Sequence, residues 1–153
     1  MNQLITFFAT GCYAGKLPLA PGTWGTGVGV LLFLLLSSLS PLAYSVTVVA
    51  CIFFAAWAAT AAQRIFEKQD PPQVVIDEIA GFLVTMAFHE PRWQLIVAGF
   101  LLFRLFDITK PFPCRWFERR FTSGWGVVLD DVMAGMYANV GLWVVGLVLM
   151  PKK

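Results

Sequence analysis

The sequence has 153 residues, of which only 13% are charged, about half the share found in an ordinary soluble domain. Hydrophobic residues make up 58% of the chain, and the mean hydropathy is +0.73. This composition excludes an intrinsically disordered chain, and a net charge of +2 does not indicate binding to nucleic acid. Length and composition together predict an integral membrane protein with a single domain over residues 1–153.

The first expected membrane helices come from a long stretch without charge. Residues 17–63 contain no charged side chain, which is more than one membrane-spanning helix of about 20 residues requires. The segment Ser37-Ser38-Leu39-Ser40-Pro41 is typical of a turn and divides the stretch. We therefore expect one membrane helix near residues 24–38 and a second near residues 42–62.

Two shorter apolar stretches follow, at residues 79–88 and 93–103. The segment His89-Glu90-Pro91 separates them, because proline cannot continue a helix and restricts the residue before it. Each stretch reaches membrane length only if its helix also includes neighbouring charged residues. These two helices are therefore expected to be short and to carry charge at one end.

The remaining segments complete an all-α arrangement. Residues 132–150 are uncharged and predict the last membrane helix. Residues 114–120 carry basic and aromatic side chains and are typical of an amphipathic helix that lies on the membrane surface. The expected fold is a polytopic membrane helix bundle of about five membrane helices, two of them short, plus a cytoplasmic interfacial helix.

The basic side chains are unevenly distributed between the two sides of the expected bundle. With a cytoplasmic N-terminus, the outer segments hold Arg92, Lys152 and Lys153, and the inner segments hold the other eight bases. Those eight are Lys16, Arg64, Lys68, Arg104, Lys110, Arg115, Arg119 and Arg120. The bias fits the positive-inside rule. The same orientation places every acidic residue except Glu90 on the cytoplasmic side.

Five acidic side chains are expected at helix ends on that side. Asp77 and Glu78 open the third expected helix, Asp107 closes the fourth, and Asp130 and Asp131 open the fifth. Charged groups within membrane segments are costly, so they mark candidate functional sites. Because five carboxylates would repel one another in a low dielectric, we expect cations among them.

Two kinds of cation could balance these carboxylates. Arg104 and Lys110 each lie three residues from Asp107 and share its helical face if the helix continues that far. One or two Mg²⁺ ions would balance more charge, since Mg²⁺ prefers hard oxygen ligands. Any single acid could instead cap a helix that faces water, but two acidic pairs plus Asp107 favour a metal or proton site.

Each acidic pair is followed by a glycine that we expect to serve helix packing. Gly81 lies four residues after Asp77, and Gly135 lies four residues after Asp131. This spacing puts the acid and the glycine on one helical face. Small residues on such a face let two membrane helices approach closely.

A glycine-rich segment, residues 15–26, leads into the first expected membrane helix. Its prolines and glycines prevent a helix before about residue 23, and Thr23 is a plausible N-cap. Backbone N–H groups ahead of a helix can hold an anion, and Lys16 would add positive charge, so Lys16, Gly22 and Thr23 are candidate phosphate-binding residues. Alternatively, Gly25 and Gly29 form a G-x-x-x-G pair that serves helix packing alone.

Two nucleophile patterns are present but do not predict function. Cys114 and Arg120 match the C-x₅-R spacing of thiol phosphatases, but no glycine lies between them to form a phosphate loop. His89 is the only histidine, and it is expected on the side opposite the acids. This excludes mechanisms that need two histidines and leaves the carboxylates as the candidate catalytic groups.

Taken together, the motifs resemble the phosphatidylglycerophosphatase A family of bacterial inner-membrane lipid phosphatases. The resemblance runs from about residue 11 to residue 140 and rests on four motifs. These are Gly15–Pro18 with Ala20–Thr23, Ile76–Glu78 with Gly81, Phe103–Asp107 with Lys110-Pro111, and Gly124–Gly126 with Asp130-Asp131 and Ala134-Gly135. It implies Mg²⁺-dependent hydrolysis of phosphatidylglycerol phosphate to phosphatidylglycerol and phosphate, the last step of phosphatidylglycerol synthesis, at a site on the cytoplasmic side.

The residues and the resemblance combine into one mechanistic hypothesis. The metal would polarise the phosphoryl group and lower the pKa of an attacking water. The expected catalytic and metal-ligating residues are Asp77, Glu78, Asp107, Asp130 and Asp131. The residues expected to bind the phosphate of the substrate are Lys16, Gly22, Thr23, Arg104 and Lys110.

Two other functions are compatible with the same residues. A metal-dependent transferase could move a lipid phosphate between alcohols, and one carboxylate could be a covalent nucleophile. A small transporter with intramembrane carboxylates would also use discontinuous helices and glycine-proline turns. In each reading the partners are the bilayer and a phospholipid or solute, and the sequence does not indicate an oligomeric state.

Overall fold

The computed structural model describes residues 2–114, 116 and 120–149, and the regular structure of these residues is entirely helical. The α-helices are α1 (Asn2–Ala9), α2 (Pro21–Leu36), α3 (Pro41–Phe66), α4 (Ile76–Thr85), α5 (Trp93–Thr109) and α7 (Gly124–Leu149), with a short 3-10 helix at Ala14–Lys16. The predicted all-α class is confirmed. The interfacial helix expected over residues 114–120 falls for the most part on residues 115 and 117–119, which lie outside the described residues.

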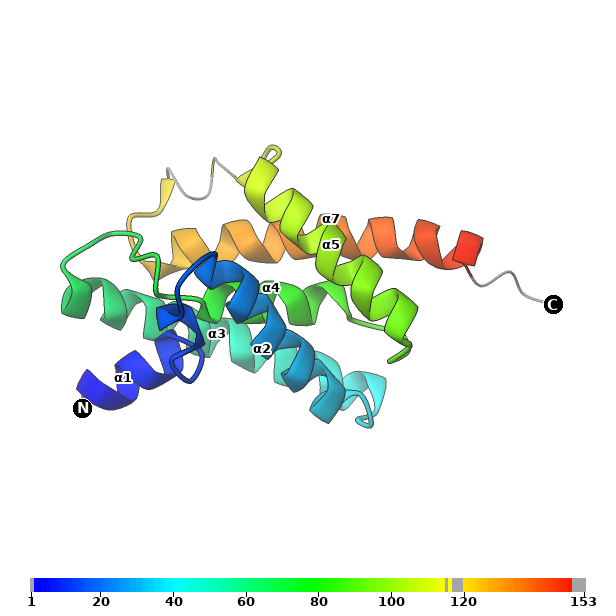
Figure 1. Ribbon diagram of the computed structural model, residues 1–153, viewed down its shortest axis with the longest axis horizontal. Helices are drawn as coiled ribbons and strands as arrows, with labels where there is room; N and C mark the ends of the chain where they lie inside the picture. Colours follow the sequence, from blue (N-terminus) through cyan, green and yellow to red (C-terminus); the bar gives the residue numbers. More distant parts are fainter. Residues whose placement is uncertain (1, 115, 117–119, 150–153) are drawn as a thin grey trace.

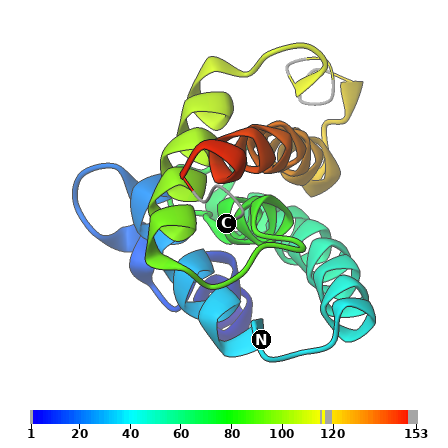
Figure 2. The same ribbon diagram turned by 90° about the vertical axis from the view of Figure 1, so that its right-hand side faces the viewer.

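The two longest helices, α3 and α7, run in opposite directions along the long axis of the molecule, and the short α4 packs against both (Figures 1 and 2). Helices α2 and α5 cross this layer obliquely, and α1 packs on α3 (Figure 1). From α2 onward, successive helices alternate in direction (Figure 1). The N-termini of α2, α4 and α7 and the C-termini of α3 and α5 therefore lie towards one end of the molecule, at the left of Figure 1.

Prolines set the starts of α2 and α3. Pro21 and Pro41 occupy the first helical turn, where the missing N–H group costs no hydrogen bond. The Ser40 side chain caps α3 by accepting a hydrogen bond from the Ala43 N–H (3.3 Å), which confirms the predicted turn. Helix α2 begins earlier than expected, so the prediction of Thr23 as its N-cap is wrong. Residue 20 occupies that position, in the left-handed backbone region.

Helix α4 is shorter than the membrane helix expected in this region. Its 10 residues span about 15 Å, half of a hydrocarbon core of about 30 Å. The helix ends where the side-chain amide of Asn139, on α7, donates to three carbonyl oxygens. These belong to Val84 (3.3 Å), Thr85 (2.9 Å) and Ala87 (2.9 Å). The amide satisfies carbonyls that a helix end leaves without intrahelical partners.

Helix α7 begins earlier than predicted. Its first residue is Gly124, whose N–H donates to the Thr60 hydroxyl on α3 (3.1 Å), whereas the sequence predicted a start near residue 132. A Cβ at Gly124 would lie 2.7 Å from the Ala56 carbonyl oxygen, so α3 and α7 touch at backbone distance here. Asp130 and Asp131 therefore lie in the second and third turns of α7 and do not open it.

Two of the described helices are long and apolar enough to cross a membrane, namely α3 and residues 124–148 of α7. Only 33% of the most apolar stretch of α3 and 28% of that of α7 are buried, so most of this apolar surface faces outward. Helix α2 is apolar but has 16 residues, and α4 has 10. The predicted number of about five membrane helices is not confirmed.

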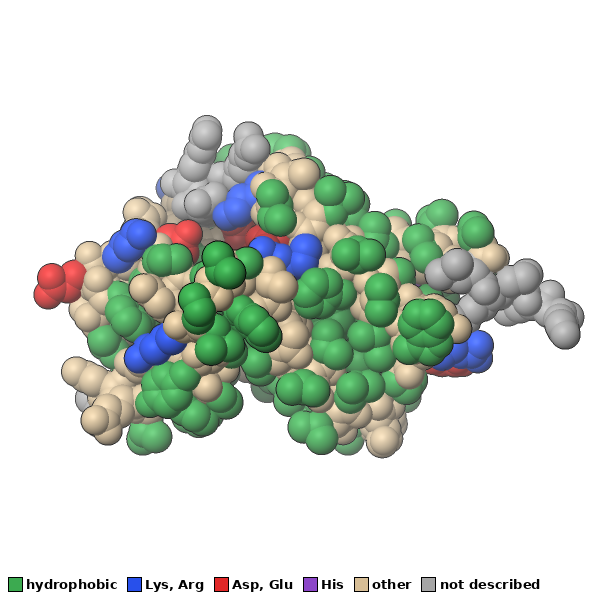
Figure 3. Space-filling model, viewed as in Figure 1, with side chains coloured by type: hydrophobic (Ala, Val, Ile, Leu, Met, Phe, Trp, Pro, Cys, Tyr) green, Lys and Arg blue, Asp and Glu red, His purple; other side chains and the backbone are tan. Residues whose placement is uncertain are grey.

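The charged side chains are confined to parts of the surface. In Figure 3 they lie mainly over the left half of the molecule and in one small group at the right, with a broad hydrophobic surface between them. Leu35 of α2, Phe53 of α3 and Val144 of α7 are apolar side chains that are more than half exposed. This distribution suits a molecule whose middle is surrounded by lipid.

The hydrophobic core forms around α4. Phe82 and Leu83 of α4 are fully buried, and Phe33, Phe103 and Leu142 reach them from α2, α5 and α7. Because α4 is enclosed by the other helices, the acidic residues in its first turn are held inside the bundle.

Candidate active site

Three carboxylates meet at the N-terminal end of α4. Asp77 and Glu78 lie in the first turn of α4, and Asp131 reaches them from α7. Each of the three offers one oxygen, and these oxygens all lie within 4.8 Å of one another. Asp77 and Asp131 are each only 4% exposed. We call these three residues the carboxylate cluster.

Close contact between two glycines brings α4 and α7 together at this point. A Cβ on Gly135 would collide with the Gly81 carbonyl oxygen. A Cβ on Gly81 would lie 2.7 Å from the Asp131 carbonyl oxygen and 2.6 Å from the Phe103 ring. Each glycine lies one helical turn after an acid of the cluster, as the sequence predicted, and their lack of side chains lets the acids approach.

The other two predicted acids are paired with basic side chains. Arg104 donates from Nη1 to the Asp107 carboxylate, one turn further along α5. Lys110 Nζ forms an ion pair with Asp130 Oδ2 at 2.5 Å, and Asp130 is 1% exposed. Lys110 does not share a helical face with Asp107, because α5 does not continue that far: it ends at Thr109, and Lys110 has a left-handed backbone (φ 43°).

Asp131 lies close enough to the other four carboxylates, those of Asp77, Glu78, Asp107 and Asp130, to act on them electrostatically. If all five were ionised, Arg104 and Lys110 would offset two of the five negative charges and leave three. In that state the site has an excess of negative charge that a bound cation would balance.

The Glu78 side chain has an unused ligand atom. Within the described part of the chain, its Oε2 is buried and has no hydrogen-bond partner. A buried carboxylate oxygen without a partner is costly, whereas coordination to a hard cation would satisfy it. The donor set of Asp77, Glu78 and Asp131 thus fits a divalent metal ion of the kind that oxygen ligands bind.

The glycine-rich segment reaches the cluster through one residue. Gly22, in the first turn of α2, is buried against both Glu78 Oε1 and the Arg104 guanidinium, and a Cβ there would lie 2.7 Å from Arg104 Nη1. Thr23 is exposed. Lys16 is also exposed, and among the described contacts its ammonium group lies over the Tyr13 ring, 4.8 Å from the centroid, and does not pair with an acid.

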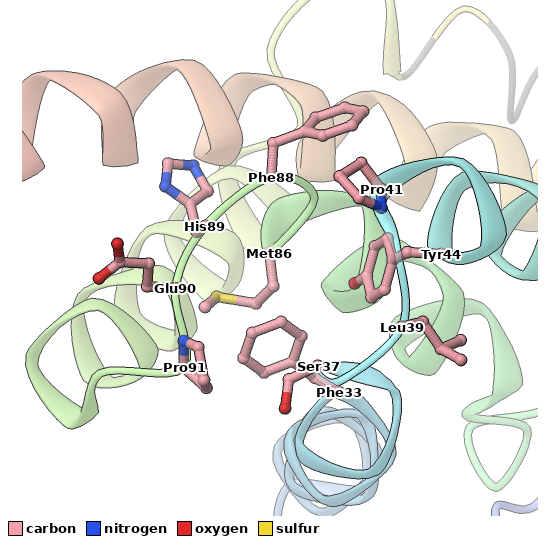
Figure 4. Close-up of a pocket in the computed structure, with 10 residues that line it drawn as sticks. All are labelled: Phe33, Ser37, Leu39, Pro41, Tyr44, Met86, Phe88, His89, Glu90 and Pro91. Atoms are coloured by element: carbon pink, nitrogen blue, oxygen red, sulfur yellow. The ribbon is translucent and has the colours of Figure 1, made fainter.

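The cysteine and the histidine lie outside the cluster. Burial raises the pKa of the Cys114 thiol and the nearby Asp130 carboxylate raises it further, which disfavours a thiolate nucleophile. His89 lines a separate cavity of about 240 Å³ between the α2–α3 turn and the α4–α5 loop, at the opposite end of the bundle (Figure 4). Its ring points towards α7 and contacts the Trp143 ring at a tilt of 45°, with 4.7 Å between ring centroids.

Sequence reasoning missed Asn139, which supports the site from a distance. By capping α4 it fixes the length of the helix that carries Asp77 and Glu78. The sequence signal that could have identified Asn139 was its position in the middle of an apolar helix. An amide there is costly unless it is hydrogen-bonded, so it indicates a partner on another helix.

Comparison with known proteins agrees with the sequence motifs. A family model described as phosphatidylglycerophosphatase A matches residues 7–146. A phosphatidylglycerophosphatase A of Haemophilus influenzae is 36% identical over 138 residues, which cover 89% of this chain and 85% of that protein. A phosphatidylglycerophosphatase A of Escherichia coli is 32% identical over 139 residues, which cover 90% of this chain and 81% of that protein.

A third relative carries a different name. A putative phosphatidylinositol-3-phosphatase of Bacteroides thetaiotaomicron is 35% identical over 155 residues, which cover 94% of this chain and 96% of that protein. No solved structure shows significant similarity to the chain.

Proposed function

Because the chain belongs to the phosphatidylglycerophosphatase A family of phosphatases, we propose that it hydrolyses the phosphomonoester of phosphatidylglycerol phosphate with the help of Mg²⁺. The products are phosphatidylglycerol and inorganic phosphate. The observation that carries the proposal is the cluster of Asp77, Glu78 and Asp131, in which both aspartates are buried and Glu78 is partly buried, and whose oxygens lie within 4.8 Å of one another. Mg²⁺ suits such a cluster because it takes oxygen ligands and is commonly completed by substrate phosphate and water.

The carboxylate cluster holds the metal in this proposal. Asp77 and Glu78 contribute from α4 and Asp131 from α7, and the buried Oε2 of Glu78 gains a partner on binding. The bound ion supplies Lewis-acid polarisation of the phosphoryl group and a lower pKa for the attacking water. The water oxygen forms a bond to phosphorus, the bond from phosphorus to the glycerol oxygen breaks, and the leaving oxygen takes up a proton.

The two acid–base pairs orient positive charge around the phosphate. Asp107 holds the Arg104 guanidinium, and Asp130 holds the Lys110 ammonium group, so both cations are fixed before the substrate arrives. Phosphoryl transfer depends mainly on positioning and on charge stabilisation, which is what such fixed groups supply. Gly22, pressed against Arg104 and Glu78, leaves room for these groups at the start of α2.

The site faces the cytoplasm in this proposal, and the chain crosses the membrane several times. The bias of basic residues supports the orientation, and the apolar surfaces of α3 and α7 support the membrane location. The acyl chains of the substrate then stay in the bilayer while its headgroup reaches the carboxylates at the interface.

The decisive experiment is an assay of the purified protein on phosphatidylglycerol phosphate, with Mg²⁺ and with a chelator. We expect phosphate release with Mg²⁺ and its loss in chelator, with recovery on re-addition of the metal. Undiminished release in chelator would overturn the metal mechanism. Appearance of a new phosphodiester instead of free phosphate would indicate a phosphotransferase.

A parallel assay on phosphatidylinositol 3-phosphate compares the headgroups named for the relatives. We expect the higher kcat/KM for phosphatidylglycerol phosphate. The reverse preference would overturn the substrate assignment and leave the phosphatase assignment standing.

A further inference from the structure

An apolar groove of about 390 Å³ lies between α1, α2, α3 and α4, next to the carboxylate cluster but separate from it. Val28, Leu31 and Leu35 form its wall on α2, and Ile76 and Ile79 form its wall on α4. The side chains that line it are apolar, and none of the described lining residues carries a charge or a hydroxyl group. A ligand in this groove would therefore have to be apolar.

The wall of the groove on α4 begins at the carboxylate cluster, and its wall on α2 begins at Val28, six residues after Gly22. On α4, Ile76 and Ile79 flank Asp77 and Glu78 within the first turn, so one turn supplies both the acids and the groove wall. On α2, Gly22 lies against Glu78, and the following turns of the same helix line the groove. The groove thus leads away from the site along two helices that also build the site.

The dimensions and exposure of the groove suit a lipid tail. Along α2 the groove runs from Val28 to Leu35, a rise of about 10 Å, and Gly22 beside the carboxylate cluster lies about 9 Å before Val28. The cluster and the groove together thus span about 20 Å, compared with about 15 Å for half of a bilayer hydrocarbon core. Leu31 is 64% exposed and Leu35 is 78% exposed, so the groove opens sideways to the surroundings of the helix. In a membrane those surroundings are hydrocarbon, and a chain can enter from the bilayer without crossing water.

We propose that this groove holds one acyl chain of the lipid whose phosphate binds at the carboxylate cluster. The inference rests on the proposed function, because it takes the substrate to be a lipid phosphate. Its consequence is selection for a long acyl chain. The apolar groove contributes binding that a soluble phosphate ester or a short-chain lipid cannot obtain, and it sets the lipid with its phosphate directed at Glu78 and Asp131.

A substitution that fills the groove tests this selection. Leu31→Trp narrows the groove at an exposed position, and Leu34→Trp, on the same helix outside the groove and 43% exposed, is the matched control. We expect Leu31→Trp to raise the KM for long-chain substrate by about tenfold, because several methylene groups lose apolar burial. The KM for a dihexanoyl substrate should stay unchanged, and Leu34→Trp should leave both values unchanged.

Equal effects of Leu31→Trp on long-chain and short-chain substrates would overturn the proposal. A change in oligomeric state caused by Leu31→Trp but not by Leu34→Trp would also overturn the proposal. It would indicate that a second copy of the chain, and not an acyl chain, occupies the groove. Thermal unfolding in detergent checks that both variants are folded.

Photocrosslinking of the unmodified protein gives a test that depends neither on a variant nor on turnover. The probe is phosphatidylglycerol phosphate with a diazirine at the end of one acyl chain, added in chelator and analysed by peptide mass spectrometry. We expect adducts on Val28, Leu31 or Ile79 that excess unlabelled phosphatidylglycerol phosphate suppresses and a zwitterionic phospholipid does not. Adducts confined to the lipid-facing surfaces of α3 and α7 would overturn the proposal that the groove holds an acyl chain.

The two proposals can fail separately. Phosphate release by the unmodified protein without adducts in the groove would overturn the proposal that the groove holds an acyl chain. The proposed function would still stand. Adducts in the groove without phosphate release would support the groove as a lipid site and overturn the proposed function.

Discussion

At the scale of single residues, the carboxylate cluster is held together against its own charge. Asp77 and Asp131 are almost fully buried, and a low dielectric strengthens repulsion between like charges. The nearest bases are already engaged, since Arg104 binds Asp107 and Lys110 binds Asp130. Without a bound cation the cluster therefore destabilises the folded protein, and binding of a cation stabilises it.

This balance predicts opposite effects of Asp131→Asn on activity and on stability without metal. We expect a loss of kcat/KM of about a hundredfold or more, because a proposed metal ligand is removed. In chelator the variant should unfold at a temperature a few degrees higher than the unmodified protein, because one of the repelling charges is gone. Phosphate release and thermal unfolding with and without Mg²⁺ measure the two effects.

Glu90→Gln is the matched control, because Glu90 is an exposed acid in the loop between α4 and α5, away from the carboxylate cluster. It should leave activity and the stabilisation by Mg²⁺ nearly unchanged. Full activity of Asp131→Asn would remove that residue from the site, and a lower unfolding temperature in chelator would contradict the idea that repulsion dominates the cluster.

A second prediction concerns the start of α2. Gly22→Ala places a Cβ 2.7 Å from Arg104 Nη1 and against Glu78, so one of these two side chains must move. Both are flexible at their ends, so we expect the protein to fold and kcat/KM to fall by about tenfold or more, since small misplacements of positioned groups are costly.

Gly27→Ala is the control, because no atom lies within 4 Å of the Cβ it would add and alanine favours a helix more than glycine does. It should retain full activity and unfold at the same or a higher temperature. Equal activities of the two alanine variants would show that the contact of Gly22 with Arg104 and Glu78 has no role in catalysis.

At the scale of helices, the site depends on the crossing of α4 and α7. Gly135 packs on the Gly81 carbonyl, and the amide of Asn139, one turn later on α7, caps the end of α4. The crossing therefore fixes both the spacing of the acids and the length of α4. Asp77 and Asp131 can meet only while the two backbones stay in contact.

Gly135→Ala tests this crossing, because its Cβ would strike the Gly81 carbonyl oxygen, a backbone atom that cannot rotate away. We expect a loss of about 1–3 kcal/mol in the free energy of unfolding and a weaker affinity for Mg²⁺, since α4 and α7 must separate. Thermal or denaturant unfolding measures the free energy of unfolding, and titration with Mg²⁺ measures the affinity for the metal.

Gly146→Ala lies on the same helix, and its nearest neighbour would be Leu95 at 3.8 Å, so this control should change neither quantity. An unfolding free energy of Gly135→Ala equal to that of Gly146→Ala would contradict the close crossing.

The helix ends show which parts of the fold could be predicted from the sequence. Pro21 and Pro41 mark helix starts through local chemistry, and the Ser40 cap lies in the turn that the sequence predicted. The end of α4 could not be predicted, because it depends on Asn139, which lies more than 50 residues away in the sequence. The start of α7 was placed too late because charge was taken to mark a helix boundary, whereas Asp130 lies inside the helix and pairs with Lys110.

The candidate site was more predictable than the helix boundaries. Acids are scarce in this chain, so Asp77, Glu78 and Asp131 stood out, and alternating helix directions bring them together whatever the lengths of the helices. The pairing of Lys110 with Asp130 was not predictable, because it requires the backbone to leave the helix at Lys110.

At the scale of the whole molecule, the two ends differ in charge. The acids of the site and most of the bases that the structure describes lie towards one end, whereas Glu90 and Arg92 form an exposed ion pair at the other. Between them lies the broad apolar surface of the bundle (Figure 3). If the long axis crosses the bilayer, the positive-inside rule places the site in the cytoplasm.

Labelling of single cysteines tests this orientation in a background without Cys12, Cys51 and Cys114. Asp70→Cys and Glu90→Cys mark the two ends, and both positions are exposed. We expect a membrane-impermeant maleimide to label Glu90→Cys from outside intact spheroplasts and to label Asp70→Cys only in inverted vesicles, because eight of the eleven bases are expected on the inner side. Labelling of both positions from one side would contradict a molecule whose ends lie on opposite faces of the membrane, and the reversed pattern would put the carboxylate cluster outside the cytoplasm. Phosphate release by each variant before labelling shows that the orientation measured is that of the folded enzyme.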